Sequence, residues 1–201
     1  MKRYECMKVL APKLKDELLV LPLGGTVDEW YNAAPHMRRR SWFHQHLGTV
    51  SPVAFGLSMG LPHRKVIALD TDGGLLLNLG IIATLGNERP ENLAVIVWDN
   101  ESYLSIGGPP THTAGRTDLA GIARACGIDR ARTVSDLEAF GRACEEALRS
   151  AGPHFIVAKV EAVREPGLAR KHADGREHKY LFVRHIEENE GITIMGPSEH
   201  N

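Results

Sequence analysis

Residues 66–80, VIALDTDGGLLLNLG, join a buried hydrophobic run to a second apolar run through two aspartates and two glycines. The continuous apolar segment 65–70 predicts a buried strand, and the spacing of apolar residues in 75–85 predicts a helix. Asp70 and Asp72 therefore stand at the carboxyl end of a strand. Open α/β sheets bind their ligands at that edge.

Similar apolar runs alternate with helix-like segments along the rest of the chain. The runs in 17–25, 92–98 and 154–161 predict three further strands. Helices are expected at residues 4–16, 26–31, 49–61 and 135–151. Continuous strands that alternate with helices predict an α/β fold: a doubly wound, mostly parallel sheet with helices on both faces.

Two helix starts and one long loop are marked by their sequences. Thr26 with Glu29, and Ser135 with Glu138, have the spacing of capping boxes. Residues 104–117, rich in Gly, Pro and Thr, form a loop that is too long for a simple connection. Loops of this length are usually functional or mobile.

The chain is expected to consist of one domain, residues 1–161, and a C-terminal extension, residues 162–201, that acts as an arm or a subunit contact. The extension surrounds an apolar segment, KYLFVRHIE (179–187), which predicts a strand. Its Arg, Lys and His side chains either bind an anionic substrate or lie in water on an arm that pairs with another subunit.

Composition excludes several classes of function. The chain has 24 basic and 25 acidic residues, so its net charge is close to zero and does not attract nucleic acid or an anionic membrane. No apolar run is long enough to cross a bilayer. Cys6, Cys126 and Cys144 are odd in number and widely spaced, which favours buried thiols in a reducing compartment over disulfides or a zinc site. The expected location is the cytoplasm.

The two aspartates allow two interpretations. A strand that ends in DxDG resembles the nucleophile motif of haloacid-dehalogenase-type phosphatases, with Asp70 as nucleophile and Asp72 as acid/base. That family places Thr or Val after the glycine, where this chain has Gly74, and needs a second acidic cluster. The phosphatase motif is therefore half complete.

In the second interpretation Asp72 is the first protein ligand of a magnesium ion. Magnesium prefers oxygen ligands, and a bridged diphosphate and water would supply several of them. The strand at 92–98 brings Asn100 to the same edge of the sheet, and the carbonyl of Ser102 can turn back toward the ion. Gly73 and Gly74 would open a helix whose free N–H groups suit a phosphate.

With this pattern the chain resembles, over residues 17–161, the diphosphate-binding domain of thiamine-diphosphate-dependent enzymes. The matching motifs are Asp72-Gly73, Asn92-Leu93 and residues 99–103, DNESY. Their combined spacing is far more specific than either half alone. The resemblance implies thiamine diphosphate and Mg²⁺ as cofactors, with the metal on Asp72, Asn100 and the Ser102 carbonyl.

The resemblance also implies the other contacts to the cofactor. Gly24, Gly25 and Thr26 match the family's first phosphate-contacting turn, and the turn at 48–50 matches the one whose bulky residue, Val50, supports the bent cofactor. The full set of cofactor contacts that it implies is Gly24, Gly25, Thr26, Gly48, Thr49, Val50, Asp72, Gly73, Gly74, Asn100, Ser102, Tyr103 and Leu104.

Two residues depart from the family pattern. Thr71 replaces the first glycine of Gly-Asp-Gly, and Gly74 stands where a hydroxyl residue commonly contacts phosphate. The lost hydrogen bond would contribute roughly 1.5 to 3 kcal/mol if it reached a charged group. Cofactor affinity is therefore expected to depend on a partner chain.

The resemblance implies a subunit of a 2-oxo acid decarboxylase that releases CO₂ and an aldehyde. In this family a second domain presents an activating glutamate to the cofactor, and this chain has room only for the diphosphate half. A separate pyrimidine-binding α subunit is expected. The segment LLNLGIIATLG (76–86) and the loop from Tyr103 to His112 are most similar to family members that act on sulfopyruvate or phosphonopyruvate, so a small anionic 2-oxo acid is expected. The alternative is a non-catalytic or regulatory subunit.

The remaining polar residues each have two possible roles. His112 is a candidate proton donor or substrate contact, or a loop histidine bonded to backbone. His44 and His46 are expected on one face of a strand, for packing or partner contact, and the arginines at 38–40 are expected to be solvated. Asp70 is expected to be structural. Met59, Trp98 and Phe140 are expected in the core.

Overall fold

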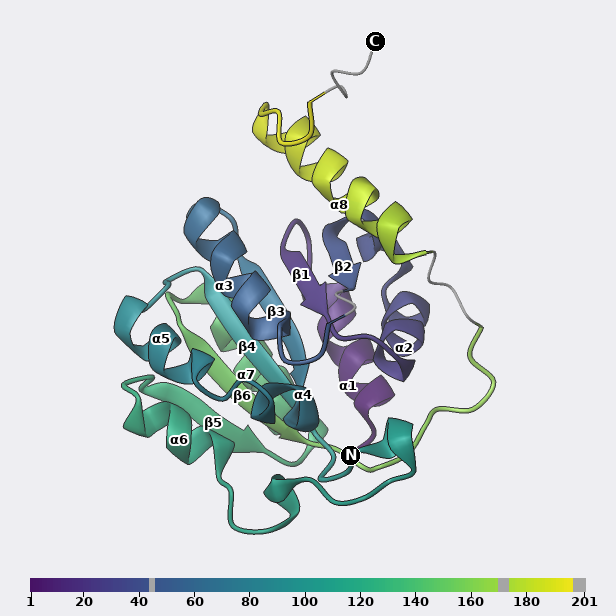
Figure 1. The fold of residues 1–201 in the computed structure, drawn as a ribbon, viewed down its shortest axis with the longest axis vertical. Coiled ribbons are helices and arrows are strands. Elements are labelled where there is room, and N and C mark those ends of the chain that lie inside the picture. The colour runs from purple at the N-terminus through teal and green to yellow at the C-terminus, as the bar shows by residue number, and fades with distance from the viewer. Residues whose placement is uncertain (44–45, 170–173, 197–201) are drawn as a thin grey trace.

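The protein contains one six-stranded sheet in which every neighbouring pair is parallel, in the order β2-β1-β3-β4-β6-β5 (Figure 1). The computed structural model describes residues 1–43, 46–169 and 174–196. The strands are β1 Leu18–Leu21, β2 Ser41–Phe43, β3 Val66–Thr71, β4 Leu93–Asp99, β5 Arg130–Val134 and β6 His154–Lys159. The predicted α/β fold with a mostly parallel sheet is confirmed.

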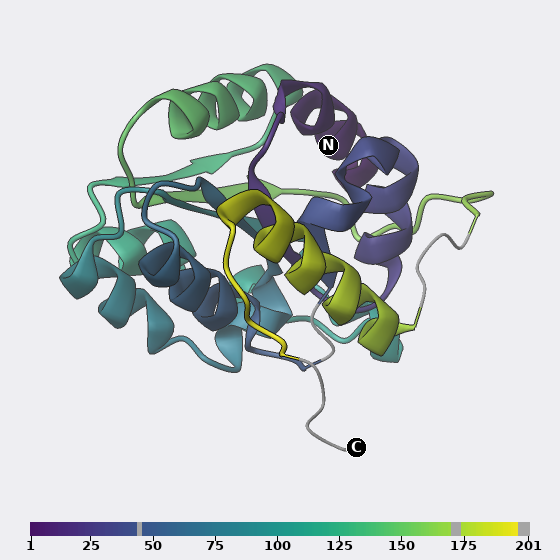
Figure 2. The same cartoon turned by 90° about the horizontal axis from the view of Figure 1, so that it is seen from above.

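Helices cover both faces of the sheet, as Figure 2 shows from above. One face packs against α1 Arg3–Leu10, α2 Gly25–Ala33 and α7 Leu137–Arg149. The other packs against α3 Val50–Gly60, α4 Asp72–Leu76, α5 Ile81–Glu88, α6 Leu119–Ala125 and α8 Gly175–Glu190. Short 3₁₀ helices are η1 Ala11–Lys13, η2 Pro35–Arg40, η3 Leu104–Ile106 and η4 His112–Ala114. The central strands are continuous apolar runs because both of their faces are buried.

Three local predictions about helices are wrong. The helix expected at 75–85 is two helices, α4 and α5. Around residues 77–80 the backbone hydrogen bonds join residues three apart, as in turns, and not four apart, as in an α-helix. Thr26 lies inside α2, and Glu29 forms an ion pair with Arg3 instead of a capping box. At α7 the N-cap is Asp136, whose Oδ1 accepts the N–H of Ala139 at 2.8 Å, in place of Ser135.

The C-terminal segment KYLFVRHIE is helical, so the strand predicted there is wrong. It lies in α8, which Asp174 caps by accepting the N–H of Arg176 at 2.8 Å. The buried side chains of α8 recur at helical spacing: His178, Phe182, His185 and Ile186. Phe182 stacks on Trp42 of β2 with ring centroids 5.9 Å apart. This part of the extension therefore packs on the edge of the sheet.

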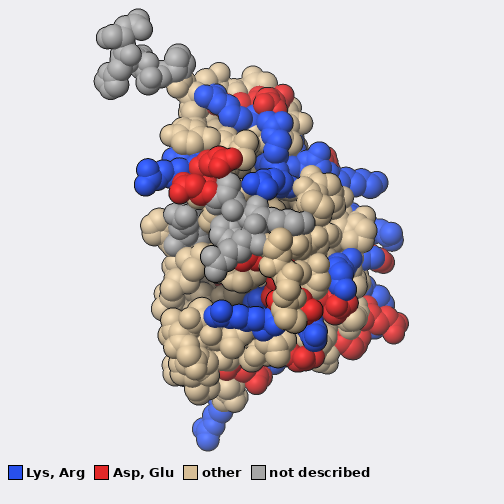
Figure 3. Space-filling view, turned by 90° about the vertical axis from the view of Figure 1, so that its right-hand side faces the viewer, with Lys and Arg blue, Asp and Glu red and all other residues tan. Residues whose placement is uncertain are grey.

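The arginines at 38–40 lie at the end of η2 and contact different elements. Arg39 pairs with Glu188 at 2.7 Å, and the Arg38 guanidinium lies 5.9 Å from the centre of the Tyr31 ring. Figure 3 shows basic and acidic side chains interspersed over this side of the molecule. Arg39 is exposed and Arg38 and Arg40 are half-buried, so the expected solvated run is confirmed for Arg39, whose exposed pair with Glu188 links η2 to α8.

The core contains most of the expected residues. Trp98 and Phe140 are buried with ring centroids 5.6 Å apart, as predicted, whereas Met59 is 50% exposed at the end of α3, so its assignment to the core is wrong. Cys6 and Cys144 are buried free thiols, as expected, whereas the free thiol of Cys126 is only half-buried. Among the described residues, no helix is both long enough and apolar enough to span a membrane.

His154, at the start of β6, gives the fold a testable pH dependence. Its buried Nε2 lies 3.0 Å from Ser150 Oγ and 3.3 Å from Arg130 Nη1. Burial, with the charges of Lys65 and Arg130, lowers the pKa of His154 from 6.5 to about 4. The unfolded chain therefore takes up this proton first as the pH falls. Stability from neutral His154 is complete above about pH 6.5 and is lost progressively toward pH 4, on the order of 2 kcal/mol in all.

Urea unfolding between pH 7 and pH 4.5 checks this expectation against H154Q as the matched control. The wild-type protein should lose more unfolding free energy over this interval than the variant. Buried Asp70 and Asp72 are present in both proteins, so their raised pKa values cancel in the difference. Equal pH slopes would show that His154 does not resist protonation.

Candidate functional site

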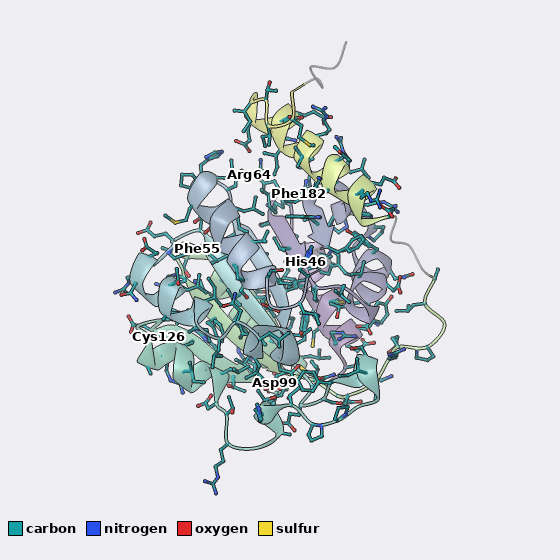
Figure 4. All side chains as sticks on the ribbon, viewed as in Figure 1. His46, Phe55, Arg64, Asp99, Cys126 and Phe182 are labelled. Atoms are coloured by element: carbon teal, nitrogen blue, oxygen red, sulfur yellow. The ribbon has the colours of Figure 1, made fainter. Side chains whose placement is uncertain are left out.

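A cavity of about 180 Å³ lies at the carboxyl edge of the sheet, where β1, β3 and β4 end. Because Thr71 pairs with Trp98 in the register of β3 and β4, the residues that follow these strands emerge side by side. Figure 4 marks this edge with Asp99, the last residue of β4.

The cavity brings together ten of the thirteen predicted cofactor contacts. They come from three segments that are distant in sequence: Gly24, Gly25, Thr26, Asp72, Gly73, Gly74, Asn100, Ser102, Tyr103 and Leu104. The turn at 48–50 lies outside the lining. Val50 begins α3 and is buried in the apolar core, while Leu47, just before this turn, lines the cavity.

Asp72 is the carboxylate of this cavity. It is only 2% exposed, and its Oδ2 accepts the hydroxyl of Thr111 at 2.7 Å. Burial raises the pKa of Asp72; the Thr111 hydrogen bond opposes the shift, and the nearby charge of Asp99 adds to it. A cation at this carboxylate would offset the cost of burying its charge.

The chain turns sharply after β4 and brings Ser102 back to the same edge. The N–H of Ser102 donates to Asn100 Oδ1 at 3.1 Å, and Glu101 adopts φ +58°. An amide oxygen has two lone pairs, so Asn100 can also bind a cation. The predicted donors are therefore one carboxylate, one amide and one carbonyl, all oxygens of the kind Mg²⁺ prefers. No cluster of three or more His, Cys, Asp or Glu suited to a metal occurs in the part of the chain that the structure describes.

Gly73 lets the Tyr103 ring approach the start of α4. A Cβ at this position would lie 2.6 Å from Tyr103 Cε1, closer than carbon atoms can pack. The glycine therefore has a steric role in shaping the cavity wall.

Thr71 and Gly74, the two departures from the family pattern, fit each other. Thr71 is the N-cap of α4, and its Oγ1 accepts the N–H of Gly74 at 3.1 Å. A Cβ on Gly74 would lie 2.8 Å from that oxygen and 3.0 Å from Asp70 Oδ1. The expectation that Gly73 and Gly74 open a helix with free N–H groups is corrected: α4 begins at Asp72, has five residues, and its Gly74 N–H is already bonded.

Asp70 points away from the cavity into the protein. One of its carboxylate oxygens accepts the hydroxyl of Ser51 at 2.5 Å, and the other accepts the N–H of Thr71 at 2.8 Å. The side chain is 1% exposed. This confirms the expected structural role, and it leaves the phosphatase interpretation without an accessible nucleophile.

Sequence reasoning missed the residues that support Asp72. Thr111 and Thr113 are both buried; Thr113 Oγ1 donates to Asp99 Oδ1 at 2.7 Å and lies 2.8 Å from Thr111 Oγ1. Lys159 pairs with Asp99 at 2.8 Å. The available signal was the alternation of threonines around His112.

The candidate histidines lie outside this network. His112 is exposed in η4 and is absent from the cavity lining, so its proposed role stays a prediction. His46 is exposed in a turn after β2, which ends at Phe43, and His44 lies outside the described residues. The shared strand face expected for this pair therefore does not extend to His46.

Two arginines line the cavity. Arg3 forms a bidentate pair with Glu29 at 2.7 and 2.8 Å. Arg164, an exposed residue of the C-terminal extension, lines both this cavity and an adjoining groove of about 1010 Å³.

The comparisons with known proteins agree with this fold. Residues 25–158 match the family described as "Thiamine pyrophosphate enzyme, C-terminal TPP binding domain", and the chain belongs to that family. The predicted family is therefore confirmed, and thiamine diphosphate is the cofactor of this domain type.

Several individual proteins are similar to this chain. The chain is 32% identical over 163 residues to sulfopyruvate decarboxylase subunit beta of Methanococcus maripaludis, covering 81% of this chain and 86% of the relative. The corresponding subunit of Methanothermobacter thermautotrophicus is 30% identical over 193 residues, 96% of this chain and 98% of the relative. Phosphonopyruvate decarboxylase of Streptomyces viridochromogenes is 32% identical over 62% of this chain but only 31% of its own length.

Solved structures support the fold alone. Benzoylformate decarboxylase of Polynucleobacter necessarius superposes with a TM-score of 0.70 at 20% identity, over 83% of this chain and 34% of that one. The 4-hydroxybenzoylformate decarboxylase of Rhodococcus jostii gives 0.67 at 18% identity, over 82% and 33%. This chain corresponds to about a third of those enzymes.

Proposed function

We propose that this chain is the diphosphate-binding subunit of a thiamine-diphosphate- and Mg²⁺-dependent decarboxylase of a small anionic 2-oxo acid, similar to sulfopyruvate or phosphonopyruvate. The observation that carries the proposal is the convergence of Asp72, Asn100 and Ser102 with the turn at 24–26 around one cavity. Relatives named sulfopyruvate decarboxylase subunit beta, matched over most of their length, support it.

The residues of the cavity would divide the work of holding the cofactor. Asp72, Asn100 and the Ser102 carbonyl would bind the magnesium ion, and the backbone of Gly24 and Gly25 would contact the diphosphate. Bound thiamine diphosphate supplies an electron sink for the electrons released as CO₂ leaves. The protein's own contribution is to bind, orient and shield the cofactor.

A separate pyrimidine-binding α subunit would complete the site and supply the activating glutamate. The rim of the cavity supports this proposal, since four of its lining side chains are apolar yet 40 to 73% exposed: Leu23, Leu47, Leu77 and Ile106. Exposed apolar side chains grouped around one cavity are typical of interaction sites. Glu29, near the cavity, is held by Arg3 and would not act on the cofactor.

The C-terminal extension would contribute to the choice of substrate. Arg164 forms no hydrogen bond or ion pair with the described residues and lines the cavity, so its guanidinium is available to an anion. A planar guanidinium suits sulfonate, phosphonate and carboxylate groups. Two roles were predicted for the basic residues of the C-terminal extension. The position of Arg164 supports the first of them, binding of an anionic substrate.

The second candidate is a non-catalytic or regulatory subunit of the same fold. The bonded Gly74 N–H favours it, because this donor is then not available to a phosphate. The mutual fit of Thr71 and Gly74 weakens it, because the two departures form one packed arrangement and not a decayed site.

Co-expression with the product of the neighbouring open reading frame, or with an α subunit of a sulfopyruvate decarboxylase, tests the proposal. We expect CO₂ release only from the pair, and at least about tenfold higher kcat/KM for sulfopyruvate or phosphonopyruvate than for pyruvate or aromatic 2-oxo acids. That margin corresponds to about 1.4 kcal/mol of transition-state binding.

Three outcomes would contradict separate parts of the proposal. Full activity of the isolated chain would remove the need for a partner. Equal rates on all four substrates would refute the anionic substrate class. Calorimetry that detects no binding of thiamine diphosphate and Mg²⁺, alone or with the partner, would favour the regulatory subunit.

A further inference from the structure

Two buried threonines connect the long loop to the carboxylate of the cavity. Thr111 is the N-cap of η4 and Thr113 lies within it, and both project their hydroxyls onto the ends of β3 and β4. Thr111 Oγ1 lies 2.7 Å from Asp72 Oδ2, and Thr113 Oγ1 lies 2.7 Å from Asp99 Oδ1 and 3.3 Å from Asp72 Oδ2. Two carboxylates, each 2% exposed, are thus joined through two hydroxyls 2.8 Å apart.

This arrangement fixes the orientation of the Asp72 carboxylate. A buried carboxylate can rotate about its terminal torsion, which is broad, unless a hydrogen bond holds one oxygen. The hydroxyls of Thr111 and Thr113 both approach Oδ2. Neither hydroxyl approaches Oδ1, and the backbone N–H of Gly73 also bonds this carboxylate. Oδ1 is then the oxygen that can turn to a cation in the cavity that Asp72 lines.

The same contacts anchor the loop that forms the cavity wall. Tyr103 and Leu104 at its start line the cavity, and Thr111 follows seven residues after Leu104. Backbone bonds close this stretch into a hairpin-like turn, from Tyr103 N–H to Pro109 carbonyl at 2.8 Å and from Thr111 N–H to Glu101 carbonyl at 3.0 Å. The Asp72 contact therefore joins the far end of the turn to the metal edge.

We propose that Thr111, assisted by Thr113, is a positioning residue that orients Asp72 for a divalent cation and couples occupation of the cation site to the order of residues 103–111. The inference rests on the proposed function, because it takes Asp72 to be a ligand of the cofactor's metal. Partners of metal ligands act in this way elsewhere, and their loss typically lowers metal affinity 10- to 100-fold.

The test uses the co-expressed complex and compares T111V, T111S and T113V with wild type. T111V removes the hydroxyl and keeps the shape, whereas T111S restores the hydroxyl. T117V is the matched control, because Thr117 lies in the same loop, is half-buried and contacts neither carboxylate. The first readout is the Kd for Mg²⁺ at saturating thiamine diphosphate, measured by calorimetry. The second is hydrogen exchange of residues 103–111 with and without Mg²⁺.

We expect T111V to raise the Kd for Mg²⁺ about 10-fold or more, T111S to stay within about 3-fold of wild type, and T117V to be unchanged. Mg²⁺ should slow exchange in residues 103–111 of wild type and T111S, but much less in T111V. T113V should show a smaller effect in the same direction. Thermal midpoints without metal show whether each variant folds.

Unchanged Mg²⁺ affinity in a folded T111V would overturn the inference. So would equal losses in T111V and T111S, since a hydroxyl would then not be the group that matters. Absence of Mg²⁺-dependent cofactor binding in the wild-type complex would instead refute the proposed function, so the two failures are distinguishable.

Discussion

Replacing Asp72 with asparagine is expected to abolish Mg²⁺-dependent cofactor binding while leaving the fold as stable as before or more stable. Asparagine has nearly the same shape but no charge, so the cation loses its one proposed carboxylate ligand. Loss of supporting partners alone costs 10- to 100-fold in metal affinity, so we expect a loss beyond about 100-fold. Burial raises the pKa of Asp72, which means that the empty fold disfavours its charge. Calorimetry and urea unfolding at neutral pH measure the two effects separately.

Asp70→Asn is the matched control, with the opposite expectation. Both oxygens of Asp70 accept hydrogen bonds, from Ser51 and Thr71, and an amide NH₂ cannot accept either one. We expect the free energy of unfolding to fall by about 1 to 3 kcal/mol and cofactor affinity to persist in the folded protein. If folded D70N lost activity while D72N kept it, the assignment of Asp72 would be wrong and the phosphatase interpretation would return.

The sheet and its functional edge could be predicted because their signals are local. The strands around Asp72 and Asn100 are continuous apolar runs, and parallel strands deliver their carboxyl ends to one edge. The residues directly after them therefore had to lie near each other. The same logic placed the turn at 24–26 beside them, since β1 pairs with β3.

Other elements were missed or mistaken because their apolar residues are sparse or ambiguous. Strand β5 at the sheet edge reads RARTV and exposes two of its side chains, so its burial pattern is weak. Helix α6 consists largely of small residues. Residues 179–187 contain a short apolar run that suits a strand, but Asp174 caps a helix before it and Trp42 of β2 receives Phe182.

The supporting contacts of the site could not be predicted from spacing. Thr111 is 39 residues from Asp72 in the sequence, and Thr113 is 14 residues from Asp99. One irregular loop brings both threonines to these carboxylates. Nothing periodic in such a loop says which side chains turn inward. The fit between Thr71 and Gly74 has the same origin, because the clash appears only once α4 has its observed N-cap.

Gly74→Ser is expected to destabilise the protein strongly, although serine is the kind of residue that the family pattern favours there. Its Cβ would lie 2.8 Å from Thr71 Oγ1 and 3.0 Å from Asp70 Oδ1. Neither neighbour can move freely, because Thr71 caps α4 and Asp70 is bonded to Ser51. We expect a loss of about 2 to 3 kcal/mol in unfolding free energy, or roughly 5 to 10 °C in thermal midpoint.

Thr71→Gly should rescue that variant, because it removes the side chain with which the new Cβ collides. Alone, T71G loses the helix cap and is expected to cost about 1 kcal/mol. The double variant T71G/G74S should lose at least about 1 kcal/mol less unfolding free energy than the sum of the two single changes. With its new hydroxyl it should also bind thiamine diphosphate at least as tightly as the wild-type protein does. G80A is the matched control, since a Cβ on Gly80 meets no atom within 4 Å. Additive losses in T71G/G74S would show that Thr71 and Gly74 depart from the family pattern independently.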